Sequence, residues 1–374
     1  MVYSVSIGIL SARSTHHQTP ADRSWQALVL GAAAMSLDIR LFFAMALGCA
    51  AVFAPAAEFA VERTSVGGVV VHVDGEHFAE YVVDQANKPY LWPIHGPSGV
   101  EMTRGYPMRM VEGEKRDHPH QRGLWFGHES IGGVDTWAEQ ATFDEHPQLA
   151  HRLAHLGRIR HREFREISGG AVAVVHAVAD HLDHDGRPVL AEERRMTFGA
   201  DADRRWIDVD IDLVAAHGPV TVADRKDAGL SIRVPHAMTV DAKQGGTIVN
   251  SAGQRDADAW AKRAVWCDFH GPVGGEHLGI AILNHPESFR HPTPWHARTY
   301  GLFTANPFGT RALDPAAPPG DVELAAGSRL RLRHRFVFHR GDEQQGRIAA
   351  MYAAYAAEPR PQDLESAACE PVGK

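Results

Sequence analysis

The sequence predicts an all-β fold, a large antiparallel sandwich of two sheets that ends in a short helix. Short runs of aliphatic, β-branched and aromatic residues recur along the chain, and several alternate between apolar and polar residues. A period of two is typical of a strand with one face in a core. Glycine and proline separate these runs, as the turns of a sandwich require. Long helical patterns between the strands are absent, so a parallel α/β fold is not expected.

The strands are predicted in order along the chain. Residues 69–73 (VVVHV) and 171–178 (AVAVVHAV) are short apolar strands. Residues 206–213 (WIDVDIDL) alternate strictly, which predicts an antiparallel strand with its aspartates on a face in water. Residues 278–283 (LGIAIL) are apolar throughout, and residues 330–338 (LRLRHRFVF) alternate again.

One clear helix is predicted near the end of the chain. It starts near Asp342, a suitable N-cap, reaches Glu358 and stops at Pro359. No linker or repeat interrupts the preceding strands. We therefore expect a single sandwich domain over residues 58–360, followed by a loose tail over residues 361–374.

The N-terminal part of the chain has the pattern of a secretory signal. Arg40 precedes an apolar run from Leu41 to Phe53, and small residues suited to cleavage follow. We expect residues 35–57 to be a signal peptide and residues 1–34 to be an upstream extension or a misread start. The mature protein is then periplasmic or secreted. The alternative is a membrane anchor, but the apolar run is short for a bilayer span.

If Met35 is the true start, the exported protein is expected to begin close to residue 58, because the signal peptide is removed on export. N-terminal sequencing of the exported protein checks this. A mature chain that begins at residue 1 would contradict it.

Composition limits the classes of partner. The formal net charge is −8 over 374 residues, which does not predict binding to nucleic acid or to an anionic membrane beyond the signal segment. Cys267 is expected to be a half-buried thiol in a strand rather than a nucleophile. In an oxidising compartment it could pair with Cys369.

The first of two histidine-rich signatures covers residues 117–129 (DHPHQRGLWFGHE). If the segment is extended, His118, His120 and Arg122 share one face. One interpretation is a divalent or transition metal held by imidazoles, with Asp117 or Glu129 as a further ligand. The other is acid–base catalysis by a histidine beside an arginine that binds a carboxylate. The structural alternative is a hydrogen-bonded loop packed under tryptophans.

The second signature covers residues 284–302 (NHPESFRHPTPWHARTYGL). If its end is a strand, His296, Arg298 and Tyr300 point the same way and Trp295 points the other way. Arginine binds a carboxylate bidentately, and histidine or tyrosine moves a proton, so this row suits a sugar or uronate site. The structural alternative is a corner of the sandwich formed by its prolines.

The candidate residues divide by role. Catalytic candidates are His120, Arg122, His128, His291, His296, Arg298 and Tyr300, and candidates for substrate binding are Trp125, His236 and Trp295. The metal candidates are His118, His120 and His128. Residues 224–227 (DRKD) are expected to be a solvated turn, and residues 306–309 (NPFG) a structural turn.

Longer motifs carry a resemblance to a known family. They are residues 88–90 (KPY), 117–128, 234–239 (VPHAMT), 250–251 (NS), 284–286, 290–296 and 300–309 (YGLFTANPFG). The chain resembles the PmoA-like family of bacterial secreted proteins, which carries the label "methane oxygenase PmoA". By analogy of fold, the resemblance implies a supersandwich like that of sugar mutarotases and some polysaccharide lyases. It does not imply methane oxidation, because the chain lacks a series of long apolar spans.

Three functions are consistent with these patterns. The leading hypothesis is an exported carbohydrate-active enzyme, a lyase, hydrolase or epimerase that uses histidine, arginine and tyrosine in a cleft. The second is a metal-dependent oxidoreductase with copper or iron, to which the family label points. The third is a glycan-binding module without catalysis. Histidine serves all three, so the sequence does not separate them.

Overall fold

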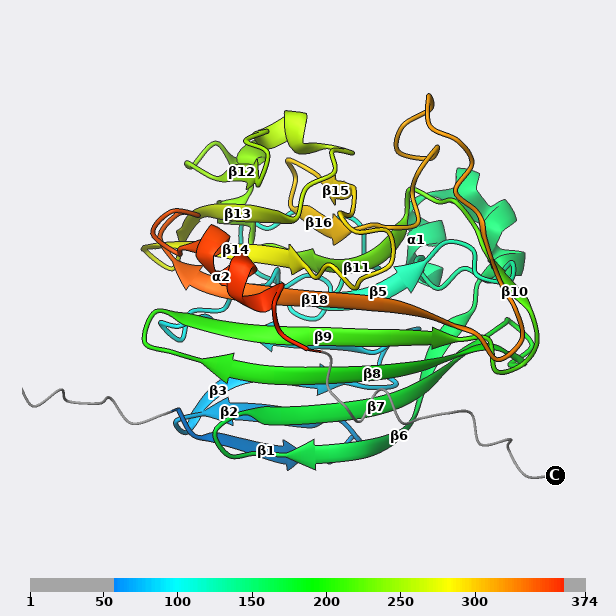
Figure 1. Cartoon of the computed structure of the whole chain (residues 1–374), viewed down its shortest axis with the longest axis horizontal. Helices are drawn as coiled ribbons and strands as arrows, with labels where there is room; N and C mark the ends of the chain where they lie inside the picture. The colour runs from blue at the N-terminus through cyan, green and yellow to red at the C-terminus, as the bar shows by residue number, and fades with distance from the viewer. Residues whose placement is uncertain (1–56, 360–374) are drawn as a thin grey trace, which may run out of the picture. The chain divides into compact units, whose positions relative to one another are not determined.

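Figure 1 shows the computed structural model of the chain, in which residues 57–359 are described. These residues form two large antiparallel sheets, a pair of short strands and several short helices. The predicted two-sheet sandwich with a short C-terminal helix is confirmed. Several predictions lie outside the described residues. They concern the upstream stretch 1–34, the signal segment apart from Ala57, the tail 361–374 and Cys369.

The first sheet has eight strands, and every neighbouring pair is antiparallel. In spatial order they are β1 (Phe59–Arg63), β2 (Val69–Val73), β3 (Glu76–Val82), β4 (Tyr90–Ile94), β5 (Leu124–His128), β11 (Ala228–Arg233), β16 (Leu302–Ala305) and β15 (Trp295–Ala297). Both histidine-rich signatures therefore contribute a strand to this sheet.

The second sheet also has eight antiparallel strands. In spatial order they are β12 (Thr247–Asn250), β13 (Trp266–Val273), β14 (Glu276–Asn284), β18 (Arg329–Arg340), β9 (Arg204–Val214), β8 (Pro188–Ala200), β7 (Ala173–Leu182) and β6 (Arg158–Ser168). The remaining elements are β10 (Val220–Val222) paired with β17 (Val322–Leu324), the helices α1 (Gln140–Glu145) and α2 (Ile348–Tyr355), and the 3₁₀ turns η1 (Pro147–His155), η2 (His236–Met238), η3 (Val240–Ala242) and η4 (Asp256–Ala259).

The core lies between the two sheets. Phe78 of β3 packs edge-on against Phe198 of β8 and Phe338 of β18, with ring centroids 5.6 and 6.5 Å apart. Phe269 of β13 meets Phe303 of β16 at 4.8 Å. These contacts join strands of different sheets, so the sheets pack face to face as in a sandwich.

The alternation of residues 206–213 is confirmed, but their aspartates are not in water. Asp208 and Asp210 of β9 accept hydrogen bonds from Arg335 and Arg333 of β18, and Asp210 is buried. Arg335 also lies 4.5 Å from the ring of Tyr355 in α2. This face of β9 is therefore covered by arginines of the neighbouring strand and by helix α2, where water was expected. The arginines pair with the carboxylates, as buried charges require.

The C-terminal helix is shorter than predicted. It begins at Ile348 instead of near Asp342. The Asp342 carboxylate does accept the backbone N–H groups of Gln344 and Gln345, as an N-cap would, but the segment that follows forms a turn. Arg347 then adopts a left-handed backbone with φ of 53°. The capping side chain predicted at Asp342 thus stabilises a turn, and the helix starts after it.

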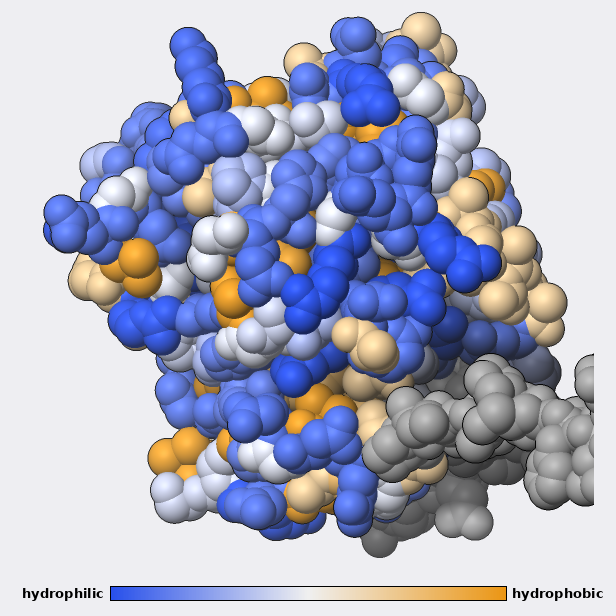
Figure 2. All heavy atoms as spheres, turned by 90° about the vertical axis from the view of Figure 1, so that its left-hand side faces the viewer, coloured by the Kyte–Doolittle hydropathy of each residue, from blue (hydrophilic) through white to orange (hydrophobic). Residues whose placement is uncertain are grey.

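The surface is predominantly hydrophilic on the face seen in Figure 2, where hydrophobic residues form small separate groups. Within residues 57–359, no helix has the length and apolar character needed to cross a membrane.

Candidate active site

The candidate site is a cavity of about 340 Å³ whose lining comes from four separate segments. They are the loop before β5, the segment around α1 and η1, the turn before β11, and β15 with the turn that follows it (Figure 1). Polar and aromatic side chains dominate the lining: His118, His120, Gln121, Trp137, Thr142, Lys226, Asp227, His296, Arg298 and Tyr300. Ligand pockets commonly measure about 300–1,000 Å³, so the volume suits a small molecule.

Hydrogen bonds from Arg104 hold the loop that carries His118 and His120. This buried arginine donates to the backbone carbonyls of Asp117, His118 and Gln121 and to the Asp117 carboxylate. His118 has a left-handed backbone with φ of 52°, so residues 118–120 form a turn instead of the expected extended segment. Both imidazoles still line the cavity, with ring centroids 5.8 Å apart.

Asp117 is the anion between two buried arginines. Arg104 and Arg233 donate to the same carboxylate oxygen, at 2.8 and 3.1 Å. Burial alone would raise the pKa of Asp117, but the contact with His118 and the charges of Arg233 and Arg104 hold that pKa well below its usual value. Burial, and then the charge of Arg104, lowers the pKa of Arg233 to about 9.

His120 is a buried, neutral imidazole. Its Nδ1 shares a hydrogen bond of 2.9 Å with the hydroxyl of Thr142 in α1. Burial, followed by the charge of Lys88, lowers the pKa of His120 well below its usual value. Its other ring nitrogen, Nε2, has no hydrogen-bond partner among the described residues and remains available to the cavity.

His296 of β15 has a defined tautomer. Its Nδ1 lies 2.8 Å from the carbonyl oxygen of Lys226 and must donate to it, since a carbonyl only accepts. The neutral ring therefore carries its lone pair on Nε2, which has no hydrogen-bond partner among residues 57–359. Burial lowers the pKa of His296 to about 4, so the ring is neutral near neutral pH. A neutral imidazole with a free lone pair is suited to accept a proton.

Two neighbours hold the ring of His296 and the carbonyl it contacts. The ring lies parallel to that of Trp137 at 6.5 Å and edge-on to that of Trp260 at 4.6 Å. The side-chain amide of Asn306 donates to the same Lys226 carbonyl at 2.8 Å. Asn306 also accepts the N–H groups of Phe308 and Gly309, so the structural turn expected over residues 306–309 is present and supports the site.

Arg298 is an exposed cation in the lining of the cavity. Its guanidinium carbon lies 4.6 Å from the ring centroid of Trp260 and 5.7 Å from that of Tyr300. In the part of the chain that the structure describes, it makes no ion pair with a carboxylate, and the residue is exposed. Arg298 is thus free to bind an anionic group of a ligand.

The Tyr300 hydroxyl is arranged to donate a proton. Burial raises the pKa of Tyr300, although Arg233 and Gln121 lower it in part. The amide oxygen of Gln121 accepts from Arg233, so the amide nitrogen of Gln121 is the end that donates to the Tyr300 oxygen. The phenolic proton is then free to be donated elsewhere. His118 stacks on the Tyr300 ring at 5.1 Å and completes this wall.

His296, Arg298 and Tyr300 all line the cavity, as the sequence predicts, although the strand ends at Ala297. Trp295 points the opposite way, also as expected. It is fully buried, packs on Phe303 and donates its indole N–H to the backbone of Ala264. It is therefore a core residue, and its predicted role in substrate binding is wrong.

Arg122 and Trp125 do not line the cavity. Arg122 donates through Nε and Nη2 to the carboxylate of Glu139, which also lies 3.5 Å from Lys88. Its charge is thus used within the protein, which corrects the prediction that it binds a substrate carboxylate. Trp125 is fully buried beneath Trp137, with ring centroids 5.7 Å apart, and supports the wall without facing a ligand.

His128, His291 and His236 also lie away from the cavity lining. His128 is buried in β5 against Phe308, and its Nδ1 accepts the backbone N–H of Ser130. His291 shares a hydrogen bond of 3.1 Å with the hydroxyl of Tyr352 in α2. His236 sits in the turn η2. The catalytic roles predicted for His128 and His291, and the binding role predicted for His236, are therefore not supported by position.

The metal site predicted at His118, His120 and His128 does not form. The ligand atoms of these three histidines do not come together in residues 57–359, where one group of suitable ligands converges elsewhere, at Asp268, His270 and Glu343. The reason is geometric. His118 and His120 lie in the loop before β5, whereas His128 lies at the far end of that strand.

Sequence reasoning missed several residues of the site. Lys226 and Asp227 line the cavity, although residues 224–227 were expected to be a solvated turn. Gln121 and Thr142 orient Tyr300 and His120, and no local pattern marks them. The close spacing of Gln121 to His120 in the first signature was the available signal.

Comparison with known proteins identifies a family but no activity. Residues 68–353 match the model of a family of unknown function, DUF6807. None of the curated proteins is similar to the chain in sequence.

Solved structures with a similar fold differ strongly in sequence. One is a galactose mutarotase-like protein from Clostridium acetobutylicum, with 7% identity and a TM-score of 0.37 over 76% of this chain and 99% of that one. Another is an alpha-galactosidase from Lactobacillus brevis, with 10% identity and a TM-score of 0.36 over 82% of this chain and 42% of that one. A third is a heparan sulfate lyase mutant from Pedobacter heparinus, with 8% identity and a TM-score of 0.29 over 77% of this chain and 36% of that one. With TM-scores below 0.5, these similarities carry no argument about the reaction.

Proposed function

This chain belongs to the DUF6807 family, and from its cavity we propose that it is a carbohydrate-active enzyme that removes a proton beside the carboxylate of an acidic sugar. The observation that carries the proposal is the pairing of a neutral base with an unpaired cation. His296 offers a free Nε2 lone pair, and Arg298 offers a guanidinium without a carboxylate partner in the described chain. Both side chains pack on the same ring, that of Trp260.

The chemistry follows from these groups. Arg298 binds the sugar carboxylate and neutralises the charge that develops when the neighbouring C–H bond breaks. His296 Nε2 accepts that proton. In an elimination, the electron pair forms a C=C bond and the adjacent C–O bond breaks, and Tyr300 donates its proton to the leaving oxygen. In an epimerisation, Tyr300 gives its proton to the other face of the same carbon, and the proton held by His296 later restores the phenol through solvent. The proposal therefore covers a lyase or an epimerase.

Hydrolysis is less well supported by the cavity. Glycoside hydrolysis usually depends on two carboxyl groups, one on each side of the scissile bond. Asp227 is the one carboxylate among the described residues that line the cavity, and Lys226 lies 3.3 Å from it. The groups available here move protons by imidazole and phenol. We place this activity in the periplasm or outside the cell, on the basis of the signal pattern at residues 35–57.

Arg298→Gln is expected to weaken binding of uronate-containing oligosaccharides by about tenfold to hundredfold, because it removes a charge-assisted contact with the carboxylate. Isothermal titration with uronate-containing and neutral oligosaccharides of matched length checks this, and product analysis follows turnover. Lys262→Gln is the matched control, since it removes the same charge from an exposed residue outside the cavity lining.

Equal affinity for acidic and neutral oligosaccharides would contradict the role of Arg298. Binding of uronates without any turnover would instead indicate a glycan-binding module. In that case the acid–base part of the proposal is wrong and the ligand class is right.

A further inference from the structure

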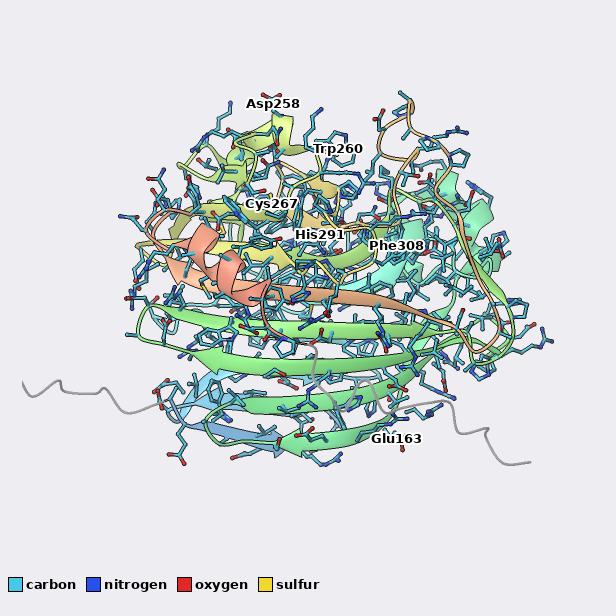
Figure 3. The ribbon with its side chains drawn as sticks, viewed as in Figure 1. Glu163, Asp258, Trp260, Cys267, His291 and Phe308 are labelled. Atoms are coloured by element: carbon cyan, nitrogen blue, oxygen red, sulfur yellow. The ribbon has the colours of Figure 1, made fainter. Side chains whose placement is uncertain are left out.

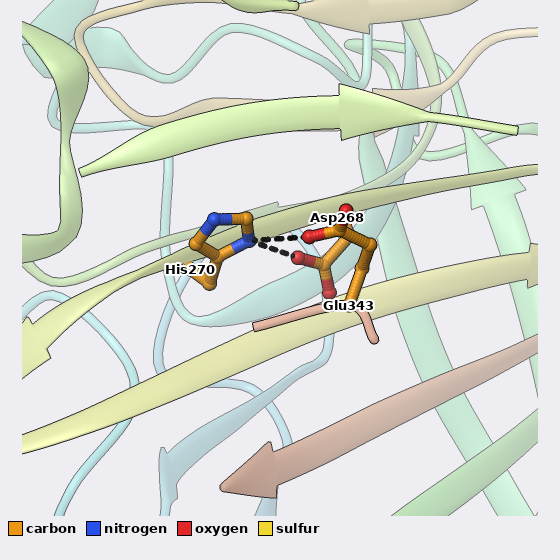
Figure 4. A group of neighbouring side chains, drawn as sticks. All are labelled: Asp268, His270 and Glu343. Carbon is orange, nitrogen blue, oxygen red and sulfur yellow. Dashed lines mark hydrogen bonds and ion pairs between the residues drawn. The ribbon is translucent and has the colours of Figure 1, made fainter. Parts of the chain in front are cut away.

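A second group of ligand-type side chains lies away from the cavity, on the second sheet. Asp268 and His270 project from the same face of β13, and Glu343 comes from the turn before α2 (Figure 4). One potential ligand atom from each lies within 4.8 Å of the other two. Asp268 is fully buried and His270 nearly so, whereas surface carboxylates generally remain in water.

We propose that Asp268, His270 and Glu343 form a binding site for a divalent transition metal of the Zn²⁺ type. His270 Nδ1 lies 2.7 Å from the nearer Asp268 oxygen and 3.7 Å from a Glu343 oxygen. Zinc binds nitrogen and oxygen at about 2.0–2.2 Å, which places tetrahedral ligand atoms roughly 3.4 Å apart. The observed separations lie on both sides of that value, so small side-chain movements bring the three atoms to one ion. A water molecule would complete the four-coordinate shell.

A contact with His339 orients the buried carboxylate of Asp268. His339 of β18 lies 2.7 Å through Nε2 from the second oxygen of Asp268, which leaves the first oxygen facing His270. Metal-binding residues are commonly held by such outer partners. Two glycines make room for the His339 ring, because a Cβ added to Gly279 or Gly346 would lie 2.2 or 2.4 Å from it.

The charges around the site favour a cation. The carboxylates of Asp268 and Glu343 both face Nδ1 of His270, at 2.7 and 3.7 Å, so negative charge converges on the point where an ion would bind. Other groups nearby are Asp342, His277, whose ring lies 5.5 Å from that of His270, and Arg255, which lies 3.6 Å from Glu343. Arg255 would have to release Glu343 when the ion binds.

The site would connect β13 to the segment that begins α2. The backbone carbonyl of Glu343 accepts the backbone N–H of Ile348, the first residue of that helix. A bound ion would therefore fix the start of α2 against the sheet and raise the melting temperature of the protein, since a ligand that binds the folded state stabilises it.

The test is titration of the chelator-treated protein with Zn²⁺ alone, by calorimetry and by thermal melting. We expect one ion per chain and a higher melting temperature, and we expect His270→Ala and Glu343→Gln each to weaken binding by about 100-fold. His277→Ala is the matched control and should bind normally, because His277 is outside the ligand group. Glu343→Gln keeps the size of the side chain in the turn before α2, so it remains informative if His270→Ala does not fold.

Three results would overturn the proposal. They are absence of Zn²⁺ binding, unchanged binding by a folded Glu343→Gln variant, and loss of binding in a His118→Ala, His120→Ala double variant. The last result would place the metal in the cavity. The outcome is independent of the proposed reaction, because none of these three ligands lines the cavity.

Discussion

His296→Gln is expected to lower the turnover of a uronate-containing oligosaccharide by about 10²- to 10⁴-fold while the protein remains folded. The range is that of a lost general base. Glutamine can retain the donated hydrogen bond to the Lys226 carbonyl, but it offers no basic nitrogen in place of Nε2. Initial rates of product formation measure the effect, and the melting temperature reports on the fold.

The pH dependence of wild-type turnover should carry the same signature. The base acts in its neutral form, so turnover falls as the pH drops through the His296 pKa of about 4. Stability also depends on this group. Its folded-state pKa is lowered, so the native state loses stability as the pH falls below the ordinary histidine value. Rates are therefore compared only where the melting curve shows the protein folded.

His236→Ala is the control for this variant, because His236 belongs to a resemblance motif but does not line the cavity. It should retain full activity. If His296→Gln remains as active as the wild-type protein, His296 is not the base. If both variants lose activity, the site extends to η2 and the assigned cavity is incomplete.

Asp117→Asn is expected to lower the free energy of unfolding by about 3 kcal/mol, because it removes the anion between two buried arginines. Breaking a buried ion pair costs about 3–5 kcal/mol, and the lower end applies because Asp117 is itself partly exposed. Arg104 and Arg233 would then keep their neutral acceptors but lose the carboxylate that both of them contact. Chemical denaturation measures the loss. Asp258→Asn is the matched control, since Asp258 lies on the surface, as Figure 3 shows, and should change stability little.

This variant should also lose part of the pH dependence of stability. Asp117 has a lowered pKa in the folded state, so its contribution is present above the unfolded carboxyl pKa of about 4 and is lost as the pH falls below it. Wild-type stability should therefore fall more steeply in that acidic range than that of Asp117→Asn. Parallel curves for the two proteins would mean that the arginines do not depend on this carboxylate.

Local periodicity predicted one wall of the cavity. A step of two residues placed His296, Arg298 and Tyr300 together and Trp295 apart, and this succeeds because the side chains alternate through β15. The turn after Ala297 does not undo the arrangement, because Tyr300 is held by His118 and Gln121. The strands of the sandwich were predictable from their apolar residues, which are buried along β9, β14 and β18, although most of the polar residues between them are buried as well.

The failures come from partners that lie far away in sequence. Arg122 is neutralised by Glu139, and His291 is held by Tyr352, which is 61 residues later. Nothing near either residue reveals its partner. Proximity in sequence also gave a wrong prediction for His128. This residue is at the end of the five-residue strand β5, and the loop of His118 precedes the start of that strand. Clusters of polar residues in the sequence indicate where a site can form, but the tertiary fold determines which of their side chains remain unpaired.

The hydrogen bonds that hold the cavity lining have a consequence for the thermodynamics of binding. Arg104 fixes the loop of His118 and His120, and Lys226 with Asn306 fixes the environment of His296. The conformational entropy of these groups is therefore lost when the chain folds and not when a ligand arrives. Arg298 differs, because within residues 57–359 its guanidinium contacts the rings of Trp260 and Tyr300 and pairs with no carboxylate. The entropic cost of association should therefore be larger for that long side chain than for His120 and His296, which are already held when the ligand arrives.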